Sequence, residues 1–173
     1  MLIACSFLVP SISNAFCFDE AGGAFGINPF LLRGIARVES NLNPAAINRN
    51  TNGSVDIGLM QVNSSWVSSM GFDAVRLRSD PCYNVMSGAK ILKLCIDRHG
   101  YTWEAVGCYN AVSRNKRVNY SWRVFDMLKA QGKKESNRLR VKGQSGSAAG
   151  RQAAGEVVIP SLSFSIRDNA AIE

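Results

Sequence analysis

The stretch RGIARVESNLNP, residues 33–44, ends an apolar helical pattern on a single carboxylate, that of Glu39. The pattern follows Asn28-Pro29, a good helix start because asparagine caps N-termini and proline suits the first turn. Apolar residues then recur near helical spacing up to Glu39. The Asn-Pro pair at residues 43–44 should close the helix, since the residue before a proline is pushed out of the helical region.

An acid at the end of an apolar helix face is the first candidate for chemistry. Desolvation disfavours the charged form of a carboxyl group, so its pKa rises and it can hold a proton near neutral pH. A general acid needs this property. Most lone acids of this kind are capping or salt-bridged structural residues, so the rest of the chain must decide the role of Glu39.

The remaining pattern predicts a mainly helical domain with a small loop or hairpin region. Residues 48–58 are polar and contain two glycines, which together with the apolar run 59–62 indicates a turn or small hairpin. Further helices are expected at about residues 64–70, 84–99, 102–111 and 116–131. Among these, 84–99 is the longest apolar-periodic segment, Gly100 ends it, Asp80-Pro81 forms a turn before it, and Gly132 ends the last helix.

Three regions differ in composition, and they define the expected domain organisation. Residues 1–15 are apolar and end in small residues, which predicts a signal peptide cleaved after Ala15. Residues 16–132 form the expected domain, and residues 133–173 are charged and then rich in small residues, which predicts a flexible or disordered tail. No later apolar stretch approaches the roughly 20 residues of a membrane-spanning helix, so stable membrane insertion is not expected.

Removal of the signal peptide leaves four cysteines, an even number in a chain that looks exported. Three pairings are possible. The preferred one joins Cys95 to Cys108, across a short turn between helical segments, and Cys17 to Cys82. A metal site is not expected, because the cysteine spacings are not those of ligands and His99 is the only histidine.

The net charge of +7 favours an anionic polymer or surface as partner. Residues 16–132 contain 13 basic and 9 acidic residues, a net charge of +4. Residues 133–173 contain 7 basic and 4 acidic residues, a net charge of +3. Nucleic acid would also attract such a chain, but no helix-turn-helix, RNA-binding or zinc-finger signature supports that partner.

Several short motifs together resemble the lysozyme-like soluble lytic transglycosylase domain. They are, in order, Glu39-Ser40, Asn43-Pro44, the run GLMQVN at 58–63, Gly88-Ala89 and Tyr109-Asn110-Ala111. The resemblance covers about residues 17–131. It is closest to the small exported members associated with type III and type IV secretion, conjugation and pilus systems. It implies a lysozyme-like α+β fold and cleavage of peptidoglycan in the periplasm, without a cofactor or metal.

The resemblance also implies roles for individual residues. Glu39 would protonate the glycosidic oxygen between N-acetylmuramic acid and N-acetylglucosamine, then act as base on the muramic C6 hydroxyl to leave a 1,6-anhydro end. Ser40 would orient or hydrogen-bond near that site, or simply face water. Met60 and Gln61 would line the cleft floor, with core packing as the alternative for Met60.

From the opposite wall, Tyr109 and Asn110 would face Glu39, with the tyrosine hydroxyl close to the carboxyl group. Two features depart from the family pattern. Val112 stands where glycine is common, which puts the local backbone geometry in doubt. Asp56 is a second acid 17 residues after Glu39, the gap of the acid pair in lysozyme.

If Asp56 faces the cleft, it can stabilise the developing positive charge or assist water, and hydrolysis becomes possible. The alternative role for Asp56 is structural, as a turn residue whose side chain hydrogen-bonds the local backbone. The sequence therefore predicts a lytic transglycosylase that opens the wall for a secretion or pilus apparatus, whose proteins the tail would contact. A lysozyme-type muramidase is the nearest rival, and a non-catalytic peptidoglycan-binding component of a secretion machine is the rival from another class.

Overall fold

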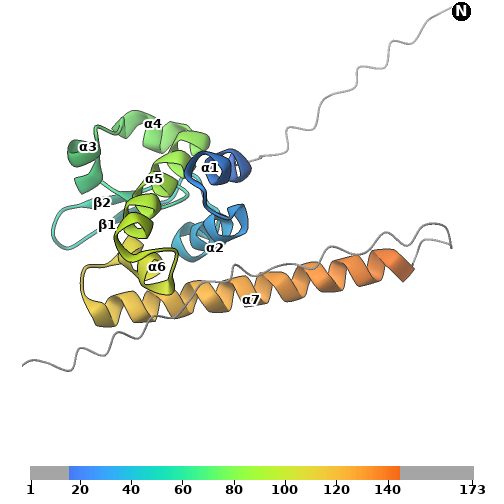
Figure 1. Cartoon of the computed structure of the whole chain (residues 1–173). Helices are drawn as coiled ribbons and strands as arrows, with labels where there is room; N and C mark the ends of the chain where they lie inside the picture. Colours follow the sequence, from blue (N-terminus) through green and yellow to red (C-terminus); the bar gives the residue numbers. More distant parts are fainter. Residues whose placement is uncertain (1–15, 145–173) are drawn as a thin grey trace, which may run out of the picture.

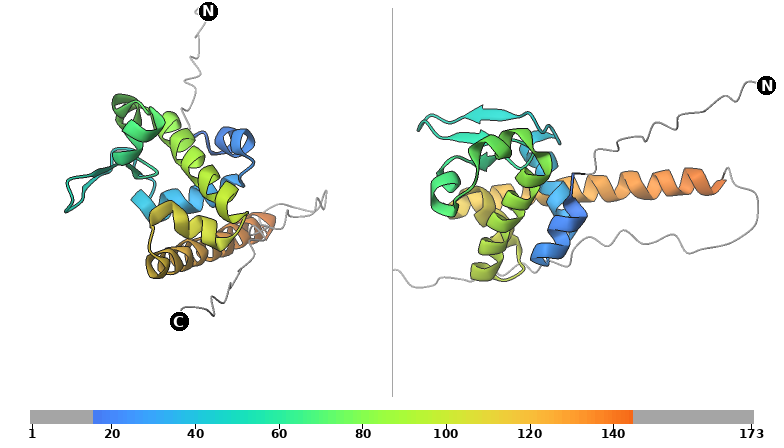
Figure 2. Two further views of the ribbon diagram at one scale, coloured as in Figure 1. Left: turned by 60° about the vertical axis from the view of Figure 1, so that its left-hand side comes forward. Right: turned by 90° about the horizontal axis from the view of Figure 1, so that it is seen from above.

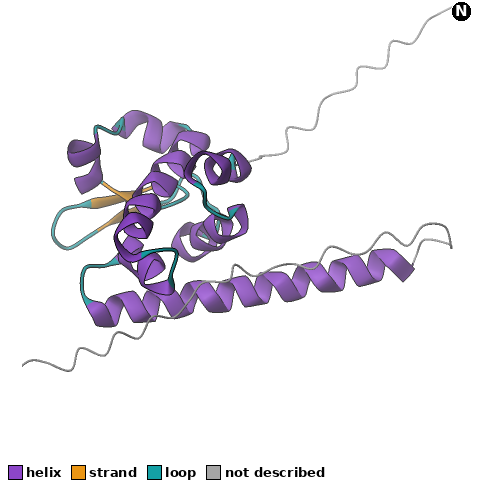
Figure 3. Cartoon of the chain, in the orientation of Figure 1, coloured by secondary structure: helices purple, strands orange, loops and turns teal. Residues whose placement is uncertain are grey.

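The computed structural model describes residues 16–144, which form seven helices and one small sheet (Figures 1 and 3). The helices are α1 (Phe18–Phe25), α2 (Pro29–Ser40), α3 (Ser65–Met70), α4 (Ala74–Ser79), α5 (Pro81–His99), α6 (Trp103–Asn110) and α7 (Arg114–Gln144). The strands are β1 (Ile47–Arg49), β2 (Val55–Ile57) and β3 (Val62–Asn63). This architecture confirms the expected mainly helical domain with a small hairpin region. The proposed signal peptide lies outside the described residues.

Helix α2 begins as expected and ends earlier than expected. The side chain of Asn28 accepts a hydrogen bond from the backbone N–H of Phe30 at 2.8 Å, and Pro29 occupies the first turn. The helix ends at Ser40 because Asn41 and Leu42 take left-handed backbone conformations, with φ of 53° and 63°. The Asn-Pro pair at residues 43–44 therefore follows the end of the helix instead of causing it.

The sheet is antiparallel in the order β1-β2-β3 and lies beside α3 (Figure 1). Gly58, just after β2, has a φ of 74°, and a Cβ there would lie 2.4 Å from the Asn84 amide nitrogen. That amide, buried on α5, donates to the carbonyls of Ile57 and Leu77 and accepts from the N–H of Met60. Asn84 thus fixes the loop between β2 and β3 against α5.

Two short helices and one helix start were not predicted. Helix α1 contains two glycines, but it buries Phe18 and Ala21, and tertiary packing outweighs its weak propensity. Helix α4 has only six residues and is capped by the side chain of Asp73. The expected turn at Asp80-Pro81 is the N-terminus of α5, where the side chain of Asp80 caps the backbone N–H of Tyr83 at 2.9 Å.

The longest described helix is α7, and the prediction that Gly132 ends it was wrong. Gly132 is buried against the domain, and the helix continues through residues 133–144, the first part of the expected tail. The views in Figures 1 and 2 show α7 running under the domain and projecting beyond it. None of the helices between residues 16 and 144 has both the length and the apolar content to cross a membrane.

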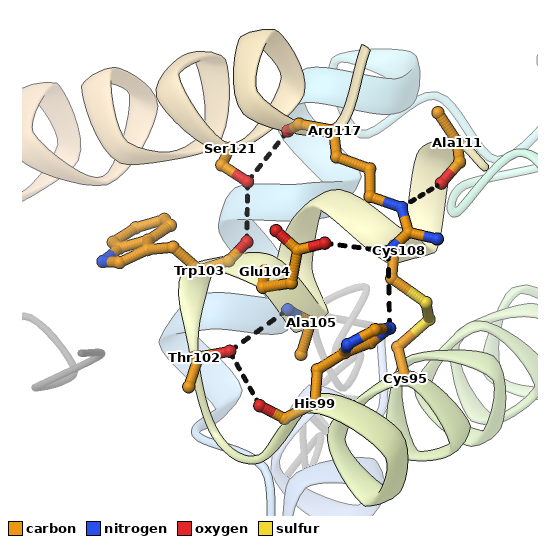
Figure 4. Close-up of a disulfide and its surroundings, with 10 residues drawn as sticks. All are labelled: Cys95, His99, Thr102, Trp103, Glu104, Ala105, Cys108, Ala111, Arg117 and Ser121. Atoms are coloured by element: carbon orange, nitrogen blue, oxygen red, sulfur yellow. Dashed lines mark hydrogen bonds and ion pairs between the residues drawn. A yellow bond between two sulfur atoms is a disulfide. The ribbon is translucent and has the colours of Figure 1, made fainter. Parts of the chain in front are cut away.

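Both preferred disulfides form, and they connect α5 to its neighbours. Cys17–Cys82 joins the start of α1 to α5, and Cys95–Cys108 joins α5 to α6. Figure 4 shows the second bridge beside Arg117, whose guanidinium donates to the Glu104 carboxylate at 2.8 Å and to a backbone carbonyl in the loop before α7. These contacts hold α6 between α5 and α7.

Candidate active site

A cavity of about 660 Å³ opens beside the last turn of α2. Its walls come from α2, the strands and their connecting loops, the start of α3, and the segment that joins α6 to α7. The residues from the expected site that line it are Glu39, Asp56, Gln61, Tyr109 and Asn110. The structure thus brings together five of the predicted residues from separate parts of the chain.

Glu39 lies in an environment that favours its protonated form. Burial raises the pKa of its carboxyl group to about 7, and the negative charge of Asp56 acts in the same direction. A hydrogen bond from Tyr120 and the positive charge of Arg123 oppose this rise. A carboxyl group with such a pKa exchanges a proton readily near neutral pH, as a general acid and base requires.

The tyrosine that hydrogen-bonds Glu39 is Tyr120, on α7. Tyr109, which was expected near the carboxyl group, lines the same cavity but has another hydrogen-bond partner. The Tyr120 hydroxyl donates to Oε1 of Glu39 at 2.5 Å, and its side chain is buried. The Tyr109 hydroxyl instead donates to the backbone carbonyl of Met60 at 2.7 Å. Burial first, and the Glu39 charge second, raise the pKa of both phenols well above the usual value, so both remain donors.

The two tyrosines still form one wall behind the acid. Their rings are stacked with centroids 6.5 Å apart and an interplanar angle of 27°. Tyr120 was not predicted as a site residue, although the sequence contains a signal for its burial. Tyr120, Val124 and Leu128 recur every four residues, and all three are buried on the same side of α7.

Asp56 lies on β2 and faces the cavity, as predicted. The side-chain amides of Asn50 and Asn63 donate to its two oxygens, at 2.9 and 2.6 Å. These two asparagines, which were not predicted as site residues, occupy the β1–β2 turn and β3. Asp56 is therefore a hydrogen-bonded carboxylate held by side chains, and not a turn residue that bonds its local backbone.

Two predicted site residues, Ser40 and Gln61, hold the loop between β2 and β3. The Ser40 hydroxyl donates to the carbonyl of Leu59 at 2.7 Å, which ties the end of α2 to this loop. Gln61 has a left-handed backbone with φ of 47°, and its side-chain amide donates to the carbonyl of Gly58 at 2.8 Å. Ser40 does not line the cavity, whereas Gln61 does.

The expectation that the Met60 side chain lines the cleft was wrong. Met60 is fully buried, and a Cβ on Gly88 of α5 would lie 2.7 Å from the Cβ of Met60. Close packing between the loop and α5 takes its side chain into the core, so only its backbone serves the site, as acceptor for Tyr109.

Further residues complete the rim of the cavity. Trp66, in α3, and Lys116, in α7, also line the cavity. Val112 is 90% exposed at this rim, and it is not among the described residues with positive φ. The backbone conformation at this position therefore does not require a glycine.

Comparison with known proteins identifies the family. The family model described as the Transglycosylase SLT domain matches residues 16–123. The chain is 36% identical to Protein IpgF of Shigella flexneri over 141 residues, covering 76% of this chain and 93% of the relative. It is 39% identical to Invasion protein IagB of Salmonella typhimurium strain SL1344 over 140 residues, which cover 74% of this chain and 88% of that relative.

A solved structure shares the fold. The X-ray structure of an inactive mutant of lytic transglycosylase Slt from Pseudomonas aeruginosa matches with a TM-score of 0.55 and 18% identity, covering 73% of this chain and 25% of that one. The predicted fold class is thereby confirmed, and the family match supports a transglycosylase-type function. The chain belongs to the transglycosylase SLT domain family.

Proposed function

We propose that this protein is a peptidoglycan lytic transglycosylase in which Glu39 acts first as acid and then as base. The observation that carries the proposal is the half-buried carboxyl group of Glu39 at the wall of an open cavity, where desolvation raises its pKa to about 7. A group of this kind is protonated in a large fraction of molecules at neutral pH and can also take a proton back.

In the first step, the Glu39 carboxyl group donates its proton to the oxygen that links C1 of N-acetylmuramic acid to C4 of N-acetylglucosamine. The C1–O bond breaks, the N-acetylglucosamine leaves with a free hydroxyl group, and positive charge develops at C1. The Tyr120 hydroxyl, which donates to Oε1 of Glu39, stabilises the carboxylate that this step produces.

In the second step, the Glu39 carboxylate removes the proton from the C6 hydroxyl of the same muramic residue. The oxygen O6 attacks C1 and closes the 1,6-anhydro ring, and Glu39 is protonated again for the next cycle. The Asp56 carboxylate faces the same cavity and favours the positive charge that develops on the sugar ring.

A lysozyme-type hydrolysis of the same bond is the second candidate, and the position of Asp56 favours it. Lysozyme uses two carboxyl groups in one cleft, a desolvated one with a raised pKa as general acid and a hydrogen-bonded one that stays ionised. Glu39 and Asp56 match this arrangement. In that reaction, water would take the place of the C6 hydroxyl, with Asp56 as nucleophile or base.

Mass spectrometry of the muropeptides released from purified peptidoglycan by residues 16–173 tests the proposal. Anhydro ends would support the intramolecular attack, and reducing ends would replace it with the muramidase. If the protein bound the wall but released no product, it would instead be a non-catalytic peptidoglycan-binding component. Glu39→Gln should abolish lysis while fold and wall binding remain, and Asp56→Asn should cause a large but smaller loss.

We further infer that the enzyme works in the periplasm, where it opens the wall for a secretion, conjugation or pilus apparatus. Its two disulfides suit an oxidising compartment, and one relative carries the name invasion protein. Fractionation of cells that express the full chain tests the location. Recovery of the oxidised protein in the cytoplasm would contradict this inference.

A further inference from the structure

The positive charge of the chain is concentrated in one helix. Helix α7 contains ten basic and two acidic residues, a net charge of +8, whereas the whole chain has +7. The rest of the chain therefore has a net charge of −1. Such a distribution directs the electrostatic attraction of the molecule to one element and not to its whole surface.

The first half of α7 belongs to the domain. Tyr120, Val124 and Leu128 are buried, and Leu128 packs so closely on α2 that a Cβ at Gly34 would lie 2.4 Å from its Cδ2. Gly132 is the last of the described buried positions along the helix. Toward its C-terminal end, α7 projects beyond the domain, most clearly in the right-hand view of Figure 2.

The basic residues at the start of this projection are available for a partner. Lys129, Lys133 and Lys134 are all exposed, and within the described side chains none of the three forms an ion pair with a carboxylate. Three more basic residues, Arg138, Arg140 and Lys142, follow in the same helix. Unpaired cations on a projecting helix attract anions without the cost of breaking internal ion pairs.

We propose that residues 129–144 of α7 form a docking arm for the carboxylate-bearing peptides of peptidoglycan. This inference rests on the proposed function, which supplies the polymer. Lys116, near the start of the same helix, lines the cavity, and Lys129 lies roughly 20 Å further along the helix axis. A polymer mesh extends well beyond one cleft, so a strand bound at Glu39 places neighbouring peptide carboxylates within reach of the arm.

A lipid bilayer is the less suitable anionic surface. A helix that lies in a membrane interface buries an apolar face among the headgroups. Residues 129–138 contain no large apolar residue, so this part of the arm has no such face. Contact through charge alone suits a hydrated polymer, and it should weaken as salt screens the charges.

Co-sedimentation with purified, insoluble peptidoglycan tests the arm. The test variant combines Lys129→Gln, Lys133→Gln and Lys134→Gln in the full chain. The control variant combines Arg33→Gln, Arg78→Gln and Arg98→Gln, which removes the same charge from exposed positions on α2, α4 and α5. Both variants are also assayed on short soluble glycan fragments, which reach the cavity without help from the arm.

At low salt, the arm variant should show a bound-to-free ratio about tenfold below that of the wild type, with little change in the control. The difference should disappear at about 0.5 M salt, and on glycan strands stripped of their peptides. Cleavage of soluble fragments should stay at the wild-type rate, so failure of the arm is distinguishable from failure of the proposed enzyme.

Equal retention of the two variants on intact peptidoglycan would overturn the proposal. It would also be overturned if the arm variant lost binding only to vesicles of anionic phospholipid, because the arm would then serve the membrane. Undiminished binding of the wild type to peptide-free strands would exclude the peptide carboxylates as the ligand.

Discussion

Replacing Glu39 by glutamine should stabilise the fold while it removes the proposed activity. The wild-type folded state contains a carboxyl group whose pKa burial raises from 4.5 to about 7. Glutamine has nearly the same shape and carries no charge, so it escapes the cost of ionisation in a desolvated site. Its side-chain oxygen can still accept the hydrogen bond from Tyr120.

The two pKa values of Glu39 set the size and the pH window of the effect. Between pH 4.5 and about 7, the folded chain keeps a proton that the unfolded chain releases, so wild-type stability falls as the pH rises through this window. The difference of about 2.5 pKa units corresponds to about 3 kcal/mol. Below pH 4.5, the loss of ionisation should therefore leave the free energy of unfolding of Glu39→Gln unchanged relative to wild type. Above about pH 7, it should make the variant about 3 kcal/mol more stable than wild type.

Urea unfolding at about pH 4, 6 and 8, followed by tryptophan fluorescence, measures this difference. Only its dependence on pH is diagnostic, because the substitution also changes packing by an amount that does not depend on pH. Glu20→Gln, which removes an exposed carboxylate from α1, is the matched control and should show no comparable trend. A stability difference for Glu39→Gln that stayed constant from acid to alkaline pH would refute the reasoning.

Three further outcomes follow from contacts in the structure. Tyr120→Phe removes the hydrogen bond that lowers the pKa of Glu39, so the alkaline limb of the pH–lysis profile should move up by about one pH unit; an unmoved limb would contradict the contact. Gly88→Ala should cost about 1–3 kcal/mol in urea unfolding because its methyl group meets a buried methionine, whereas Gly23→Ala, in open space on α1, should not destabilise the protein; equal effects would contradict this packing. Reduction of the disulfides should lower the melting temperature, with a loss of about 2–5 kcal/mol per bridge, and an unchanged melting temperature would show that the bridges do not support the fold.

The sequence predicted correctly those elements whose ends depend on residues only a few positions away. The start of α2 followed from Asn28-Pro29, because a cap and a first-turn proline act within a few residues. The hairpin before Gly58 followed from its polar, glycine-containing sequence. The cysteine pairing followed from the expected arrangement of consecutive helices.

Local signals failed where packing outweighed them. Gly132 suggested a helix end, yet it lies buried within α7, where the modest cost of a helical glycine is tolerated. Helix α1 has a weak helical sequence and is held by its buried residues and by the bridge from Cys17. Met60 was placed in the cleft by resemblance, whereas its contact with Gly88 puts it in the core.

The sequence by itself determined that an acid ends an apolar helix, that a second acid follows 17 residues later, and that both belong to a known set of motifs. Only the tertiary structure decided that Tyr120, 81 residues away, is the partner of Glu39, and that the pKa of Glu39 reaches about 7. The reason is physical. Desolvation and hydrogen bonding depend on which distant segments enclose a group, and no local pattern around Glu39 specifies that α7 will cross behind it.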